Sequence, residues 1–277
     1  MVDPQGIAPN GPRAPRRAYP RSWGLIEAAS GIAAALVLGG GWSWLTRTVV
    51  MPGELALAGA YLAVWVPLLA ACTVAVVRGT RSPVRDLGLR FAWIDVLWGL
   101  GLGLVARAVT SLIELAAYGR TSGSGAFIQP GAFAVLFGLL FATVLAGPLI
   151  EELFFRGLLL RATLRTFPRV DAGPRPSAGA APGGGAPADA AAPGGAHPAP
   201  LLRASIAAVA VPALVFALLH LADSAARSPA SMAVTFASTL FLGLAAGTAT
   251  VLTGRLGAAI LAHAAYNGIL VWLLLAT

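Results

Sequence analysis

Seven long apolar stretches constrain the fold of this chain more than any other feature of its sequence. An α-helix rises about 1.5 Å per residue, so about 20 apolar residues are enough to cross the hydrocarbon core of a bilayer. The pattern therefore predicts an all-α membrane protein, a bundle of about seven transmembrane helices. The stretches cover residues 23–46, 55–77, 91–117, 131–160, 203–222, 230–252 and 255–276.

The composition excludes an ordinary soluble protein. Only 11% of the 277 residues are charged, whereas about a quarter are charged in a typical soluble domain. The net charge of +8 comes from 19 basic residues, all of them arginine. Most of them lie between the apolar stretches, where they set topology, so we expect no nucleic-acid partner. The single cysteine, Cys72, excludes an intramolecular disulfide and a cysteine-rich zinc site.

Arginine positions predict the orientation of the spans. The N-terminal segment and the second and fourth loops carry most of the arginines, and the first, third and fifth loops have only Arg47, Arg120 and Arg227. Because loops rich in Lys and Arg stay in the cytoplasm, we expect a multi-pass protein of the plasma membrane. Its N-terminus would be cytoplasmic and its C-terminus, after seven crossings, outside.

Composition also divides the chain into four segments. Residues 1–22 are rich in Pro and Arg and predict a disordered cytoplasmic tail, followed by transmembrane helices 1–4 in 23–165. Residues 166–202 are rich in Ala, Gly and Pro and predict a flexible cytoplasmic linker. Residues 203–277 hold transmembrane helices 5–7.

Polar side chains inside the spans are the candidates for function, because such residues are costly in lipid and usually face one another. Glu152 and Arg156 are spaced i,i+4 and can form an ion pair along one helix face. Phe216 and His220 repeat this spacing, as do His263 and Asn267. We expect Glu27, Arg107 and Glu114 to be packing or interface groups. The other polar residues, Glu151, Glu152, Arg156, His220, His263 and Asn267, predict one polar cavity between the late helices.

These residue types support the activation of a water molecule for amide hydrolysis. With Arg156 assigned to Glu152, the carboxylate of Glu151 is the candidate general base, and a histidine can share its proton. A second histidine and an Asn amide can donate hydrogen bonds to an oxyanion. No HExxH helix is present. We therefore favour no cofactor, although a divalent metal such as zinc could be held by Glu151, His220 and His263.

The two histidines lie at different expected depths. Counted at about 1.5 Å per residue from the cytoplasmic ends of the spans, His220 is about 25 Å deep and His263 about 12 Å deep. They can meet only if the boundaries shift, the fifth helix projects into the cytoplasm, or the tilts differ. We expect the cavity to open toward the cytoplasm.

Three segments resemble the motifs of a known family. They are EELFFR (151–156), FALLH (216–220) and HAAYN (263–267), in that order on late spans. They resemble the CPBP family, the CAAX-protease and bacteriocin-processing (Abi) intramembrane proteases, which include the type II CAAX prenyl endopeptidases. The DLGLR segment before the third span is also similar, so the resemblance covers roughly residues 84–276. The long linker between the first and second motifs departs from the family.

The resemblance implies a bacterial intramembrane endopeptidase and a role for each matching residue. Glu151 and His220 would activate the attacking water, and His263 and Asn267 would stabilise the oxyanion. Glu152 and Arg156 would support the first motif and Phe216 the second. A glutamate mechanism is favoured over a metalloprotease mechanism. The partners would be the lipid bilayer and a membrane-anchored or hydrophobic peptide or protein substrate.

Two other functions remain as alternatives. Carboxylates and histidines within spans also serve proton relays, so a proton-coupled transporter is one of them. No inverted repeat of the spans is visible in the sequence to support it. The other is a non-catalytic immunity or binding protein built on the same fold.

Overall fold

The computed structural model describes residues 23–121, 131–167, 198–223 and 228–276. The regular secondary structure of these segments is entirely helical, and seven of the helices are long and apolar enough to cross a membrane. The predicted all-α membrane bundle is therefore confirmed. The expected tail at 1–22 and most of the expected linker at 166–202 lie outside the described residues.

The first half of the chain contributes three spanning helices and one short helix. Glycines or prolines mark several of their ends: α2 follows Pro52, and Gly119 ends α4 with a φ of 69°. A left-handed φ of this kind favours glycine, which has no Cβ to clash with the backbone. The helices are α1 (Leu25–Thr48), α2 (Gly53–Arg78), α3 (Pro83–Asp86) and α4 (Ile94–Tyr118).

The fourth span is one continuous helix built from four pieces, two of which are π-helical. In a π-helix each N–H donates to the carbonyl five residues earlier instead of four, and such segments occur often at functional sites. The motif residues Glu151 and Glu152 lie in a short α-helical piece between the two π stretches. The pieces are η1 (Ala134–Ala146), α5 (Gly147–Glu152), η2 (Leu153–Leu159) and α6 (Leu160–Thr166).

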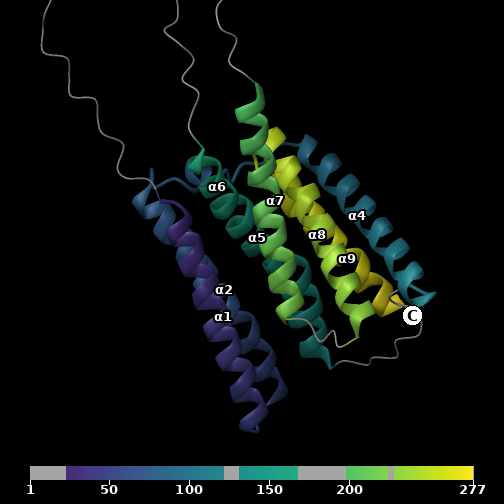
Figure 1. Ribbon diagram of the computed structural model, residues 1–277. Coiled ribbons are helices and arrows are strands. Elements are labelled where there is room, and N and C mark those ends of the chain that lie inside the picture. The colour runs from purple at the N-terminus through teal and green to yellow at the C-terminus, as the bar shows by residue number, and fades with distance from the viewer. Residues whose placement is uncertain (1–22, 122–130, 168–197, 224–227, 277) are drawn as a thin grey trace, which may run out of the picture.

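Three further helices complete the bundle. The α7 helix covers Pro198–Asp223, α8 covers Pro229–Thr253 and α9 covers Gly257–Ala276. The α1 and α2 helices form one antiparallel hairpin, α7 packs mainly on α8, and α4 packs mainly on α9 (Figure 1). The fourth span contacts α2, α7 and α9, so its motif residues face the middle of the bundle.

Glycines bring α4 and α9 into close contact. Gly99 and Gly103 are spaced i,i+4 on α4, and a Cβ on Gly103 would lie 2.7 Å from the carbonyl oxygen of Ala262. A Cβ on Gly99 would clash with the Cβ of Leu261. Small residues at such spacing allow two membrane helices to approach closely. This contact fixes the position of the helix that carries His263 and Asn267.

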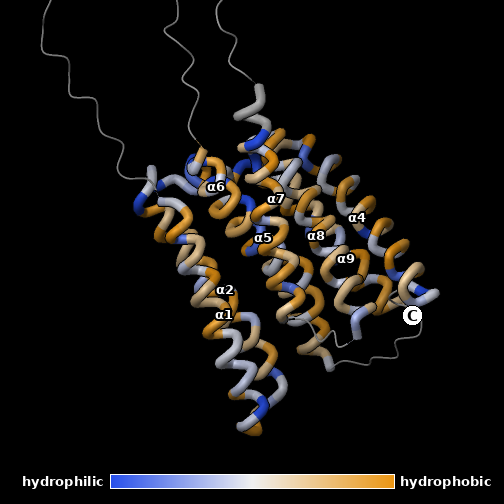
Figure 2. The backbone as a smooth tube through the Cα atoms, in the orientation of Figure 1, coloured by the Kyte–Doolittle hydropathy of each residue, from blue (hydrophilic) through white to orange (hydrophobic). Residues whose placement is uncertain are grey.

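One end of the bundle is held by arginines, and we call it the arginine-rich end because Arg90, Arg161, Arg165 and Arg255 lie there. Arg161 donates from Nε to the carbonyl of Leu87 at 3.0 Å and from Nη2 to that of Gly254 at 3.0 Å. Arg255 pairs with the buried carboxylate of Asp95, Nη2 to Oδ1, at 2.7 Å. These contacts join the fourth span and α4 to the loop from which α9 starts. Figure 2 shows the helices coloured mostly as hydrophobic, with hydrophilic residues chiefly near their ends.

The α7 helix resolves the difference in depth between the two histidines. It begins at Pro198, five residues before the expected start of the span at 203. Figure 1 shows that it extends beyond the neighbouring helices at the arginine-rich end. A position far along α7 therefore reaches the same level of the bundle as a position near the start of α9. This arrangement agrees with projection of the fifth helix past its neighbours. That the projecting end is cytoplasmic stays a prediction.

Candidate active site

A cavity of about 280 Å³ lies inside the bundle, among the fourth span, α2, α7, α8 and α9. Its walls combine apolar groups, including Pro148, Phe216 and Leu242, with a set of polar side chains. Ligand sites commonly have this character, a mostly apolar pocket with a few placed polar groups. The polar side chains are those of Tyr61, Thr143, Glu151, His220, Thr239, His263, Tyr266 and Asn267.

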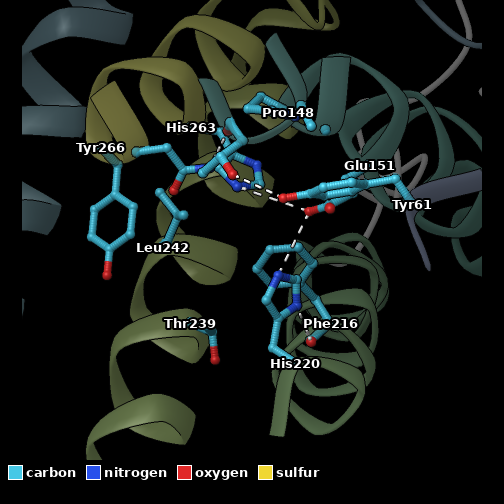
Figure 3. A pocket seen from close by; sticks show the side chains of 13 residues that line it. Tyr61, Pro148, Glu151, Phe216, His220, Thr239, Leu242, His263 and Tyr266 are labelled. Carbon is cyan, nitrogen blue, oxygen red and sulfur yellow. Dashed lines mark hydrogen bonds and ion pairs between the residues drawn. The ribbon is translucent and has the colours of Figure 1, made fainter. Parts of the chain in front are cut away.

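Two histidine rings converge on one oxygen of Glu151. The Nε2 atom of His220 lies 3.7 Å from Glu151 Oε2, and the Nε2 atom of His263 lies 3.9 Å from the same oxygen. Figure 3 shows this carboxylate between the two rings. Both distances exceed that of a direct hydrogen bond. The three groups therefore surround a common point.

Hydrogen bonds on the far side of each ring determine which nitrogen faces Glu151. His220 Nδ1 lies 3.0 Å from the carbonyl oxygen of Phe216. Because a carbonyl oxygen only accepts, Nδ1 must carry the hydrogen. In the neutral ring Nε2 is then the nitrogen with the lone pair, and it is directed at Glu151. Nε2 of His220 and the carboxylate of Glu151 can thus each accept a proton at the same point in the cavity.

Glu152 lies behind this point and is completely buried. Its Oε1 atom is 2.9 Å from Arg156 Nη1 and 2.9 Å from His263 Nδ1. The predicted i,i+4 ion pair is confirmed, and both of its side chains are 0% exposed. Within the described residues, Glu152 Oε2 and Arg156 Nε and Nη2 have no hydrogen-bond partner. Such a pair is a weak source of stability, because desolvation offsets most of the attraction. Its geometry instead sets the orientation of His263.

Phe216 forms the apolar wall that separates these groups. Its ring lies 4.1 Å from that of His220 and 5.6 Å from that of His263, centroid to centroid, and the latter contact is edge-to-face. The guanidinium carbon of Arg156 lies 4.7 Å from the centre of the same ring. One side chain therefore contacts both histidines and the buried cation.

Asn267 reaches the cavity one turn beyond His263. Its Nδ2 donates a 2.8 Å hydrogen bond to the carbonyl oxygen of Thr143, in η1. Since that oxygen accepts only, the amide nitrogen rather than the amide oxygen must face it. This leaves the second N–H of the same group for a ligand in the cavity.

The residues that the sequence singles out therefore separate into two groups. Glu151, His220, His263, Asn267 and Phe216 line one cavity, and Glu152 and Arg156 lie directly behind it. The other in-span charges lie elsewhere. Glu27 pairs with Arg78, and Arg107 pairs with Glu114 at 2.7 Å. Neither pair contributes to the cavity wall, as expected for packing or interface groups.

Four polar lining residues were not expected from the sequence: Tyr61, Thr143, Thr239 and Tyr266. A lone tyrosine or threonine in a span has an ordinary packing role and carries no spacing signal. Thr143 is the exception, because Pro148 follows it by five residues. That proline removes a backbone donor, and the carbonyl it leaves free depends on the helical register.

The cavity also contains side chains of types that bind metal ions. Glu151, His220 and His263 are ligand types that zinc accepts. In the described part of the chain, however, no group of three or more His, Cys, Asp or Glu side chains is arranged to hold a metal ion. The expectation that no metal is needed stays a prediction.

The fold and the cavity define a class of protein, a multi-pass membrane protein with a carboxylate–histidine site enclosed by its helices. The family model described as type II CAAX prenyl endopeptidase Rce1-like matches residues 132–269, just under half of the chain, in agreement with the resemblance that the motifs predict. The matched segment contains all three motifs, and the family is one of CAAX-type intramembrane proteases. No curated protein and no solved structure gives a significant match.

Proposed function

We propose that this protein is an intramembrane endopeptidase that hydrolyses a peptide bond of a membrane-associated protein or peptide. One observation carries the proposal: two histidine Nε2 atoms face the same carboxylate oxygen of Glu151, at 3.7 and 3.9 Å, inside a cavity enclosed by apolar helices. Activated water needs a base at such a point, and the family match supports a protease.

Glu151 and His220 activate the attacking water in this proposal. A water molecule beside the pair, on the cavity side, can contact both Glu151 Oε2 and His220 Nε2, which are 3.7 Å apart. Attack on the substrate carbonyl passes the water proton to this pair. The pair then returns the proton to the leaving amine, so the proton balance of hydrolysis closes.

His263 and Asn267 stabilise the oxyanion. Asn267 has a second amide N–H to donate, because the first is held by Thr143. His263 can donate from Nε2 only in its charged form, in which both ring nitrogens carry hydrogen. Glu152, 2.9 Å from His263 Nδ1, is the counter-ion next to that form. Preorganised donors of this kind act where negative charge develops in the transition state.

The substrate is a hydrophobic or membrane-anchored chain. The cavity lies within helices whose outer surfaces are largely apolar, and its volume of about 280 Å³ accommodates a short length of peptide. A prenylated protein is the first candidate, since the family is described by prenyl endopeptidase activity.

No metal is needed in the mechanism we favour. In the alternative, Glu151, His220 and His263 would hold a zinc ion that polarises the water and the carbonyl. The two mechanisms use the same three side chains, so mutating these residues does not distinguish the mechanisms. Removing the metal does distinguish them.

We also propose a bacterial plasma-membrane protein with a cytoplasmic arginine-rich end, a cytoplasmic N-terminus and an external C-terminus. The positive-inside tendency supports this orientation. In a Cys72→Ala background, Val50→Cys and Arg81→Cys place thiols at exposed positions at opposite ends of the bundle. A membrane-impermeant thiol reagent added to intact cells should label Val50→Cys alone. Labelling of Arg81→Cys alone would reverse the orientation.

The proposed function is tested with purified protein in liposomes. The probe is a fluorogenic peptide with a farnesylated C-terminal CAAX sequence, and the same peptide without the farnesyl group is run beside it. Wild-type protein should cleave at least one of them, and Glu151→Ala and His220→Ala should be at least 100-fold slower, the order of a lost general base. Equal cleavage by all three proteins would refute the proposal. A proton flux driven by a pH gradient in the same liposomes would instead favour the transporter.

A further inference from the structure

Tyr61 on α2 lies outside the segment that the family model matches, yet it lines the cavity. We propose that Tyr61 is a positioning residue for Asn267, and that it acts through a π-helical turn at Thr143. The inference rests on the proposed function, because it assigns the group that holds the oxyanion donor in place.

The turn in question leaves one backbone carbonyl free. The N–H of Gly147 donates to the carbonyl of Ala142, five residues earlier, which is the π register. In this register the donor for the Thr143 carbonyl would be residue 148. That residue is a proline and has no N–H. The Thr143 oxygen is therefore available to Asn267, whose Nδ2 lies 2.8 Å away.

The π register leaves the Thr143 carbonyl to Asn267 alone. In an ordinary α-helix the Thr143 carbonyl would accept from the residue four positions later, which is Gly147 and has an N–H. A change to the α register would thus give the Thr143 oxygen a partner inside its own helix. Asn267 would then share this carbonyl oxygen with the N–H of Gly147. The contact that fixes the orientation of the Asn267 amide would be weaker.

Tyr61 supports the π register from the neighbouring helix. Its hydroxyl lies 3.2 Å from Thr143 Oγ1 and 3.4 Å from the carbonyl oxygen of Gly138, and Thr143 Oγ1 donates to that same oxygen at 2.9 Å. Gly138 is the residue whose carbonyl pairs with residue 143 in a π-helix. The two hydroxyls therefore join the two positions that the π register brings together.

The ring of Tyr61 is held by aromatic neighbours. Its centroid is 4.9 Å from that of Trp65 and 6.0 Å from that of Phe137, the second contact being edge-to-face. Removal of the hydroxyl alone therefore leaves the ring in place. The chain of contacts from Tyr61 through Thr143 to Asn267 links the α1–α2 hairpin to the candidate oxyanion donor.

The test compares Tyr61→Phe with wild type on the farnesylated probe peptide. We expect kcat to fall about three- to tenfold, the scale of one lost hydrogen bond, and KM to stay within about twofold. Thr143→Val should behave like Tyr61→Phe, and Thr143→Ser, which keeps the hydroxyl, should retain wild-type kcat. In an Asn267→Ala background, Tyr61→Phe should cause no further loss, because both changes affect the same donor.

Tyr118→Phe is the matched control, since Tyr118 is 42% exposed at the end of α4, away from the cavity. Equal kcat for Tyr61→Phe and Tyr118→Phe would overturn the inference. It would also be overturned if the fold-reductions in kcat caused by Tyr61→Phe and Asn267→Ala multiplied in the double variant. Both outcomes presuppose a wild type that is faster than Glu151→Ala. A wild type no faster than Glu151→Ala would refute the proposed function, and the inference with it.

Discussion

The Nδ1 atom of His263 lies 2.9 Å from Oε1 of Glu152, a residue on another span and 111 positions earlier in the chain. Arg156 contacts the same carboxylate oxygen, and all three side chains are buried. The second glutamate of the pair at 151–152 therefore orients a ring of the site instead of facing the cavity. Adjacent glutamates on one helix point in different directions, and here this difference gives them different roles.

Glu152→Gln should destabilise the protein and also slow cleavage. The amide leaves the Arg156 charge buried without its counter-ion, a change that typically costs about 3–5 kcal/mol. It also weakens the hold on His263. We expect a lower unfolding temperature in detergent and a lower kcat on the farnesylated probe. The matched control is Glu54→Gln, because Glu54 is exposed at the start of α2. The two variants should not share the same unfolding temperature; if they do, Glu152 has no structural role.

His220→Asn should separate the structural from the chemical contribution of His220. The Asn amide can donate to the Phe216 carbonyl much as Nδ1 does, but it has no group in the place of Nε2. We expect an unfolding temperature near that of wild type and a loss in kcat of about 100-fold or more. Initial rates and thermal unfolding of one preparation measure both. Near-wild-type turnover by His220→Asn would remove Nε2 from the proposed mechanism.

Metal removal should leave activity unchanged. Protein treated with a zinc chelator and then separated from it should contain no zinc or other divalent transition metal and should cleave the probe at the original rate. Metal content by mass spectrometry and the initial rate are measured on the same sample. A loss of activity that returns when zinc is added would replace the glutamate mechanism with the metal one, with Glu151, His220 and His263 as ligands.

Gly103→Ala should move α9 and with it the candidate oxyanion donors. The added Cβ would lie 2.7 Å from the carbonyl oxygen of Ala262 and 2.7 Å from the Cβ of Ala265, so the helices must separate. Overpacking of this kind typically costs about 1–3 kcal/mol. We expect a lower unfolding temperature and slower cleavage of the probe.

Gly101→Ala is the control for this change, because its Cβ would meet nothing within 4 Å. It should unfold and cleave like wild type. If Gly103→Ala also behaves like wild type, the close approach of α4 and α9 does not set the geometry of the site.

The spans and the motif residues could be predicted from the sequence because their signals are local. Seven runs of apolar residues are long enough to cross a bilayer, whatever their neighbours are. Polar residues within such runs are energetically unfavourable in lipid. The residue type alone therefore identifies four candidates in the apolar segments: Glu151, His220, His263 and Asn267. The Glu152–Arg156 pair follows from a spacing of four residues.

Other features of the site depend on contacts that no local pattern encodes. Counting along the spans placed His220 and His263 at different depths, and the start of α7 at Pro198 brings them to one level. The contact between Glu152 and His263 joins two separate spans, and Tyr61 and Thr143 reach the cavity only through packing.

The sequence by itself determined that this chain spans a membrane. It also identified the polar side chains whose burial in lipid is so unfavourable that they must contact one another. The tertiary structure decided which of them meet. A helix can rotate and slide along its axis without changing its own hydrogen bonds, so its partners depend on close packing, as at Gly99 and Gly103. The hydroxyl that contacts Thr143 in the π-helical turn comes from Tyr61 on another helix. These contacts direct Glu151 toward two histidines and Glu152 toward only one of them.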